Sequence, residues 1–220
     1  MDYREIITFI MEMVGTVAFA ASGAMVGVGR KMDIFGVSVL GVVTAVGGGM
    51  IRDIVLGVIP PSVFQHAVYA AVATVTSCLV FMVLYLRSEL LEGRFRVTYD
   101  KVMLVMDSIG LGIFTVVGVN TGIHHGYLGH TFLLVFLGTI TGVGGGLLRD
   151  MMAGVPPYIF VRHIYACASI VGAVVCVYMY RLFGSVEAMV VASAVVVLIR
   201  YLAAHYHWNL PRLTLEEKEK

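Results

Sequence analysis

Residues 40–53 read LGVVTAVGGGMIRD, and residues 137–150 read LGTITGVGGGLLRD. Both copies lie within long apolar runs, and a Pro-Pro pair follows each of them after a short interval. The apolar segments that precede the copies match more weakly, with Glu12 opposite Asp107. The chain is therefore built from an internal repeat whose copies are offset by 95–97 residues.

The composition is that of an integral membrane protein. Of the 220 residues, 59% are hydrophobic and 13% charged, and the mean hydropathy is +0.92. Soluble domains are about 45–50% apolar and about 25% charged, so a soluble core of this size cannot hold the excess. A helix needs about 20 apolar residues to cross the hydrocarbon core of a bilayer. The sequence predicts seven such helices, at residues 6–28, 34–57, 64–86, 101–121, 129–152, 160–182 and 184–206.

The repeat divides these helices into two units of three. The first unit spans about residues 5–86 and the second about residues 101–182, while the seventh helix at about 184–206 has no counterpart. Because each unit holds an odd number of spans, the second copy is inverted in the membrane, as in many transporters. The predicted fold is all-α, with one transmembrane domain over residues 1–208 and a cytoplasmic tail at 209–220.

The placement of basic residues predicts the orientation. The side that holds the N-terminus carries only Arg4 and Arg181. The basic residues assigned to the opposite side are Arg30, Lys31, Arg87, Arg94, Arg96, Lys101, Arg162, Arg200, Arg212, Lys218 and Lys220. Cytoplasmic loops carry the excess of Lys and Arg, so we expect a multi-pass protein of the cell inner (plasma) membrane with its N-terminus outside and its C-terminus in the cytoplasm. A net charge of +1 argues against a nucleic-acid partner.

The two glycine triplets fall inside the second and fifth predicted spans. Glycine costs about 1 kcal/mol relative to alanine in a helix interior, so three in succession favour a kink or a break. Backbone groups freed in a bilayer are tolerated only inside protein or beside a wet cavity. The triplets either let helices pack closely or expose backbone groups to a permeating species, and their recurrence before Arg-Asp favours exposure. The glycines concerned are Gly47, Gly48, Gly49, Gly144, Gly145 and Gly146.

Four charged residues inside the spans follow the triplets, namely Arg52, Asp53, Arg149 and Asp150. A charge at the bilayer centre costs about 2.5–3.5 kcal/mol on insertion scales and normally faces a partner or water. Adjacent residues of a helix do not face each other, so Arg52 and Asp53 are not expected to pair. Their depth in the membrane predicts the ion pairs Glu12–Arg52 and Asp107–Arg149. Each aspartate of the Arg-Asp pairs is expected to cap a half-helix end or to attract cations.

No catalytic or cofactor-binding pattern accompanies these residues. The sequence has no Ser-His-Asp order, nucleotide-binding loop or metal-ligand helix. Cys78, Cys167 and Cys176 lie in apolar runs without the spacing of a metal or redox site. We therefore expect neither an enzyme nor a bound metal or cofactor, apart from a permeant potassium or sodium ion.

The doubled Gly-Gly-Gly-x-x-Arg-Asp motif, in a three-plus-three-plus-one arrangement, resembles the prokaryotic branch of the trimeric intracellular cation (TRIC) channels. It is equally similar to the related bacterial family described as glycine transporters. The resemblance covers about residues 5–206. It implies a homotrimer with one pore in each protomer, kinked second and fifth spans around that pore, and conduction of monovalent cations, chiefly potassium.

Two functions remain open. In a passive cation channel, glycine carbonyls replace part of the hydration of the ion, the aspartates attract cations, and the arginines constrict or gate the path. The other polar residues expected to line this path are Ser22, Thr44, Thr115, Asn120 and Thr141. In a carrier of a small zwitterion such as glycine, a half-helix N-terminus holds the carboxylate with help from Arg52 or Arg149, and the inverted repeats provide alternating access. We favour the channel.

Overall fold

The structure is a computed structural model that describes residues 3–87, 95–161, 164–206 and 208. Within these residues it is all-α, and seven helices are long and apolar enough to cross a membrane. These helices are α1 (Tyr3–Gly29), α2 (Ile34–Leu56), α4 (Val68–Leu86), α5 (Phe95–His124), α6 (Thr131–Met152), α8 (Tyr165–Phe183) and α9 (Ser185–His205). The seven predicted spans are confirmed. The predicted tail at 209–220 lies outside the described residues.

Two spans begin later than predicted because a one-turn helix precedes each of them. These are α3 (Ser62–Gln65) before α4 and α7 (Tyr158–Val161) before α8. After α2, Gly57 adopts a left-handed conformation with φ 73°, and after α6, Gly154 does so with φ 64°. Glycine reaches this conformation without steric cost and ends helices for that reason. The Pro-Pro pairs then keep the chain from resuming a helix at once.

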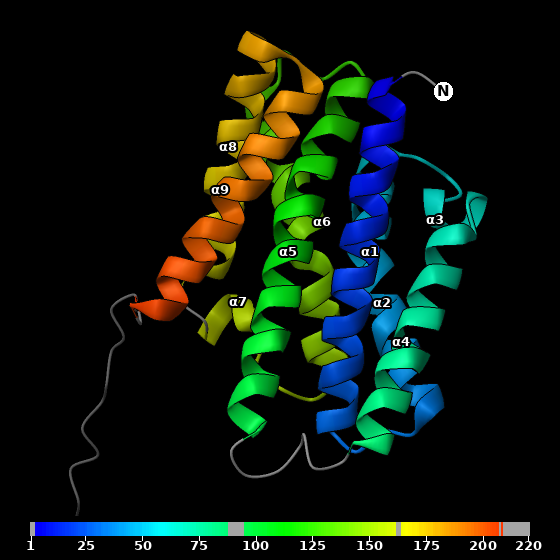
Figure 1. Ribbon diagram of the computed structural model, residues 1–220. Helices are drawn as coiled ribbons and strands as arrows, with labels where there is room; N and C mark the ends of the chain where they lie inside the picture. The colour runs from blue at the N-terminus through cyan, green and yellow to red at the C-terminus, as the bar shows by residue number, and fades with distance from the viewer. Residues whose placement is uncertain (1–2, 88–94, 162–163, 207, 209–220) are drawn as a thin grey trace, which may run out of the picture.

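The two repeats run in opposite directions. Figure 1 shows α1 running away from the end of the molecule where the chain begins, whereas α5 runs toward that end. We call the end where α1 begins and α2 ends the N-terminal face, and the end where α1 ends and α6 ends the C-terminal face. Between the repeats, α1 packs against α5 and α2 against α6, while α9 packs on α5 and α8. The inverted plan thus brings the two glycine triplets together.

The helices do not break at the triplets. Both α2 and α6 are continuous α-helices through their three glycines, so the predicted break is wrong, and the predicted kink stays a prediction. A Cβ added at Gly48 would collide with the carbonyl oxygen of Thr141, and one at Gly145 with the carbonyl oxygen of Thr44. The glycines therefore allow two helix backbones to approach closely, which is the alternative to the predicted exposure of backbone groups. An unbroken hydrogen-bond ladder also avoids unpaired backbone groups in the bilayer.

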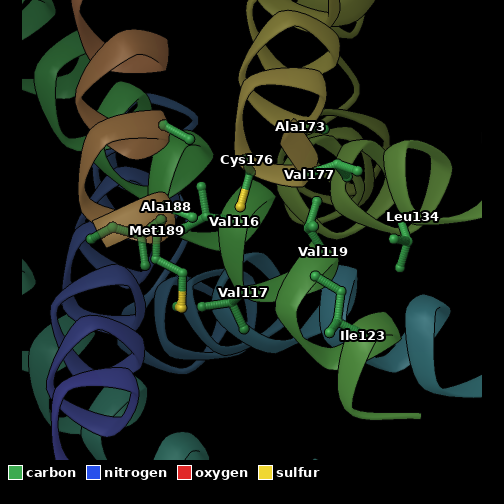
Figure 2. Packing of buried hydrophobic residues seen from close by; sticks show 12 residues of the cluster. Val116, Val117, Val119, Ile123, Leu134, Ala173, Cys176, Val177, Ala188 and Met189 are labelled. Atoms are coloured by element: carbon green, nitrogen blue, oxygen red, sulfur yellow. The ribbon is translucent and has the colours of Figure 1, made fainter. Parts of the chain in front are cut away.

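An apolar core holds α5, α6, α8 and α9 together (Figure 2). Val116 and Val119 of α5 are fully buried, and Val177 of α8 and Met189 of α9 pack in the same cluster. Cys176 is also part of it, as expected for a small apolar packing residue. This packing places α9, which has no counterpart in the repeat, against the centre of the second unit.

Candidate functional site

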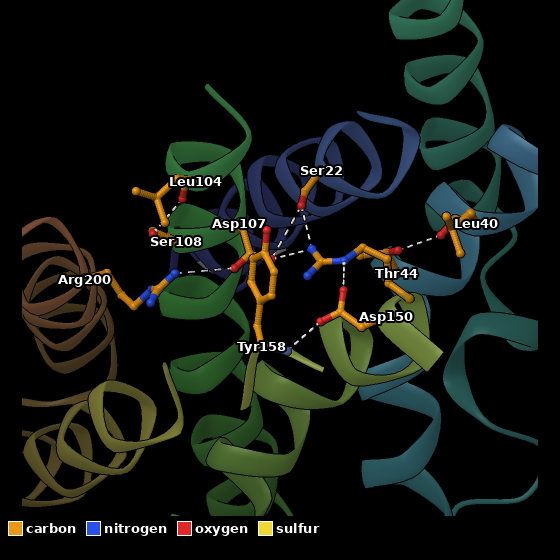
Figure 3. Close-up of polar contacts among 10 residues, drawn as sticks. Ser22, Leu40, Thr44, Leu104, Asp107, Ser108, Asp150, Tyr158 and Arg200 are labelled. Atoms are coloured by element: carbon orange, nitrogen blue, oxygen red, sulfur yellow. Dashed lines mark hydrogen bonds and ion pairs between the residues drawn. The ribbon is translucent and has the colours of Figure 1, made fainter. Parts of the chain in front are cut away.

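The half of the molecule next to the C-terminal face contains a buried cluster of charged residues around Arg149. Its Nη1 lies 2.5 Å from Asp107 Oδ1 and donates to Ser22 Oγ at 2.7 Å. Its Nε donates to Asp150 Oδ1 at 2.8 Å (Figure 3). Side chains from α1, α5 and α6 therefore meet at one guanidinium that is 0% exposed. The predicted Asp107–Arg149 ion pair is confirmed.

A second arginine reaches this cluster from α9. Arg200 is 3% exposed, and its Nη2 lies 3.9 Å from Asp107 Oδ2 (Figure 3). Its Cζ lies 4.9 Å from the centroid of the Tyr165 ring, in cation–π geometry. The assignment of Arg200 to the charges of the membrane surface was wrong, because packing of α9 on α5 turns it inward. Two carboxylates and two guanidiniums make the cluster neutral, and we call these residues with Tyr165 the C-face cluster.

The corresponding residues of the first repeat are arranged differently. Arg52 donates to Asp53 Oδ1 from Nη2 at 2.7 Å and from Nε at 2.9 Å. Glu12 instead accepts a hydrogen bond from the hydroxyl of Tyr69. The predicted Glu12–Arg52 ion pair is therefore wrong, and so is the expectation that Arg52 and Asp53 stay apart. A guanidinium on a long side chain can curve back to the next residue even though the two Cβ atoms point in different directions.

Both aspartates of the Arg-Asp pairs tie a long helix to the short helix that follows it. Asp53 Oδ2 accepts the backbone N–H of Ser62 at 2.8 Å, and Asp150 Oδ2 accepts that of Tyr158 at 2.8 Å. Free N–H groups at a helix start carry partial positive charge, so a carboxylate there is favourable. The half-helix ends that these aspartates were expected to cap do not form, because α2 and α6 are continuous. Each aspartate instead accepts from the first residue of a one-turn helix, and cation attraction stays a prediction.

A cavity of about 240 Å³ lies in the half of the molecule next to the N-terminal face. Glu12, Arg52 and Asp53 line it together with Gly49 and Tyr69. The lining thus combines two carboxyl groups, one guanidinium and the imidazole of His66. A second cavity of about 310 Å³ shares Glu12 in its lining and extends between α1 and α5 toward the start of α9. Glu12 therefore borders both spaces.

The remaining predicted site residues are engaged in local contacts. Thr44 donates to the carbonyl of Leu40, and Thr141 to that of Leu137, each at 2.6 Å. Both threonines are buried where α2 and α6 meet.

Farther from the triplets, Thr115 is hydrogen-bonded to Ser169 at 2.7 Å. Asn120 accepts from Ser185 at 2.8 Å and also borders the second cavity. Among the glycines, Gly47 is packed against Leu148, and Gly144 against Gly48. That any of these residues lines a permeation path stays a prediction.

Sequence reasoning missed two tyrosines and one arginine of the charged clusters. Tyr69 and Tyr165 each stand eight residues after the second proline of a Pro-Pro pair, and each lies beside the acidic residue of its repeat. This shared position was a usable signal. Arg200 also stood within the predicted span at 184–206, where a charge calls for a partner.

Known proteins resemble the chain over nearly all of its length. The family model described as "Glycine transporter" matches residues 9–85 and 104–181, one copy on each repeat. The UPF0126 inner membrane protein YadS of Escherichia coli (strain K12) is 37% identical over 214 residues, which cover 96% of this chain and 98% of the relative. The UPF0126 membrane protein YvgT of Bacillus subtilis (strain 168) is 31% identical over 203 residues, covering 92% and 94%.

Solved structures of TRIC channels share the fold. A prokaryotic TRIC channel superposes with a TM-score of 0.84 at 28% identity, over 94% of this chain and 100% of the other. The TRIC trimeric intracellular cation channel orthologue from Rhodobacter sphaeroides gives 0.80 at 29% identity, over 91% and 98%. A further TRIC cation channel gives 0.78 at 33% identity, over 94% and 97%. The chain is thus a multi-pass inner-membrane protein that belongs to the Glycine transporter family within the TRIC superfamily.

Proposed function

We propose that the chain is a channel for monovalent cations, chiefly potassium, with one pore in each protomer of a homotrimer. The observation that carries this proposal is the cavity of the N-terminal half, where Glu12 and Asp53 face a single Arg52. An excess of negative charge in a low-dielectric recess raises the local concentration of cations. The likeness to solved TRIC channels at 28–33% identity supports the same function.

The C-face cluster is the natural gate of this channel. Arg149 and Asp107 are completely buried, and we propose that they close the path at this depth. The arginines stand against carboxylates, and this pairing removes the repulsion that a free guanidinium would exert on a cation. Opening requires Arg149 to leave the position between α1, α5 and α6. Since α2 and α6 keep their hydrogen-bond ladders, side chains rather than triplet carbonyls line the proposed path.

Planar-bilayer recording tests the proposal. Purified protein is expected to give stepwise unitary currents, and under a potassium gradient the reversal potential is expected to follow the potassium equilibrium potential. The C-terminal face is proposed to be cytoplasmic, which one-sided labelling of a cysteine at either end would check. Protein that is correctly folded and reconstituted but passes no unitary current would contradict the channel.

The charge of Glu12 is expected to set part of the conductance. Glu12→Gln leaves one carboxylate against one guanidinium in the cavity, so the potassium conductance should fall about two- to fivefold at 0.01–0.1 M salt and approach the parent value at 1 M, where the Debye length is about 3 Å. Glu187→Gln is the matched control, because Glu187 is an exposed acid at the start of α9 and does not line the cavity. Equal losses in both variants would show that the cavity charge is not special.

A carrier of a small zwitterion is the second candidate. The cavity presents a guanidinium and carboxyl groups side by side, which are the groups that would bind the two charged ends of a zwitterion. The inverted repeats suit alternating access. Saturable glycine counterflow in liposomes without unitary currents would favour the carrier over the channel.

A further inference from the structure

Glu12 differs from the other acids that the repeat motifs place within the membrane spans. The other three, Asp53, Asp107 and Asp150, each form an ion pair with an arginine of the motifs at 2.5–2.8 Å. Glu12 forms no ion pair with any residue that the structure describes, and its Oε2 accepts a hydrogen bond from the Tyr69 hydroxyl. Of these four acids, Glu12 is therefore the one that has a neutral partner in place of a cation.

The two repeats use their arginines in different ways. In the second repeat, one guanidinium serves both acids, because Arg149 reaches Asp107 with Nη1 and Asp150 with Nε. In the first repeat, Arg52 gives both Nε and Nη2 to one oxygen of the aspartate that follows it. The carboxyl group of Glu12 is left without a share of that guanidinium.

Glu12 lies where the two cavities meet. It lines both of them, as does Thr121 of α5. The second cavity is also lined by Arg4, Glu5 and His124, which are exposed at the N-terminal face. A proton from the aqueous phase on this side therefore has a route to the carboxyl group between α1 and α5.

The position of Glu12 suits the binding of a proton. An ionised carboxylate without a cation partner is costly inside a bilayer, and binding a proton removes that cost. The Tyr69 hydroxyl donates to Oε2, which leaves Oε1 to take the proton. We propose that the Glu12 carboxyl group is a proton-binding site, and that a proton bound there competes with the cations that enter the cavity.

The competition follows from the charges that line the cavity. With Glu12 ionised and His66 neutral, two carboxylates face the single guanidinium of Arg52. With Glu12 protonated, Asp53 alone balances that guanidinium, so the attraction for cations is lost. This second part of the inference rests on the proposed channel, whereas the proton site itself does not.

Other titratable groups face Glu12, and their effects must be separated from its own. Histidine changes its charge between about pH 5 and pH 8, and a proton on an imidazole in the cavity would also repel cations. Within the described part of the chain, α6 and α9 contribute no titratable side chain to the two linings. The charged and titratable residues that line the cavities with Glu12 are Arg4 and Glu5 of α1, Arg52 and Asp53 of α2, His66 between α3 and α4, Tyr69 of α4, His124 of α5 and Tyr180 of α8.

Infrared difference spectroscopy tests proton binding directly. The purified full chain in lipid is compared at about pH 8 and about pH 5, a range in which exposed carboxyl groups stay mostly ionised. The carbonyl band of a protonated carboxyl group is expected at the lower pH. It should be absent in Glu12→Gln and present in the control Glu187→Gln. This readout needs no ion flow, so it applies whether or not the chain conducts.

Planar-bilayer recording tests the competition with cations. In about 0.1 M salt, the same acidification is expected to lower the potassium conductance of the parent about two- to fivefold. Glu12→Gln should begin at the lowered value and show no further fall, while His66→Gln and His124→Gln should each retain the fall. Tyr69→Phe removes a donor that favours the ionised carboxylate, so its conductance should fall at a higher pH than that of the parent.

The two measurements separate the possible failures. A parent without the carbonyl band at the lower pH, or a band that persists in Glu12→Gln, would overturn the proton site. A fall in conductance that persists in Glu12→Gln, or that disappears in either histidine variant, would overturn the competition and assign the pH response to an imidazole. A band that depends on Glu12 in a protein that passes no current would support the proton site and contradict the channel alone.

Discussion

Replacing Arg149 with methionine is expected to destabilise the protein by about 3–5 kcal/mol, because it strands two buried carboxylates. Asp107 and Asp150 are 0% and 1% exposed, and each lies within hydrogen-bond distance of this guanidinium. Methionine fills much of the volume but offers neither charge nor donors. Unfolding by denaturant in mixed micelles, followed by circular dichroism, measures the loss.

Arg52→Met is the matched control for this change. Arg52 holds the equivalent position in the first repeat, but it borders a cavity that can hydrate Asp53 once the guanidinium is gone. A clearly smaller loss is therefore expected. In a double-mutant cycle, Asp107→Asn combined with Arg149→Met should show a coupling energy of about 1–3 kcal/mol. Additive losses would mean that the ion pair does not stabilise the fold.

Substituting alanine for Gly145 is expected to separate the two central helices and to cost about 1–3 kcal/mol by overpacking. The added methyl group would meet the backbone carbonyl of Thr44, which no rotamer change can move away. Alanine has the better helix propensity by about 1 kcal/mol, so a net loss isolates the steric effect. The same unfolding assay gives the free energy.

Gly49→Ala separates the packing of the glycines from their conformational freedom. Nothing lies closer than 3.8 Å to a Cβ at this position, so the helix-propensity gain should dominate and the variant should be as stable as the parent or more so. If Gly49→Ala and Gly145→Ala destabilised the protein equally, a role of the triplets in bending would replace the role in helix contact.

The architecture could be predicted because it depends on hydrophobic length and on the repeat. The seven apolar runs, their approximate positions and the pairing of the motifs follow from residue patterns alone. Whether the helices continue through the triplets could not be predicted, since glycine lowers helix propensity and also permits close helix contact. Which effect dominates depends on what lies opposite, and the carbonyl oxygens of Thr44 and Thr141 are opposite only after folding.

The charged site could be predicted only in part for a related reason. Depth in the membrane correctly paired Asp107 with Arg149, which lie on the neighbouring helices α5 and α6. Depth alone failed for Glu12, where Tyr69 offers a nearer donor, and for Arg52, whose long side chain reaches its own neighbour. The inward turn of Arg200 depends on the rotation of α9 about its axis, which apolar content alone leaves open.

The unpaired helix α9 has an energetic consequence for any conformational cycle. In a perfectly duplicated protein, a state open on one side and the state related to it by the two-fold axis of the repeats would have equal free energies. Arg200 adds attraction to one end and nothing to the other, so this equality is lifted. The seventh helix can thus bias which of the two sides of the molecule is closed at rest.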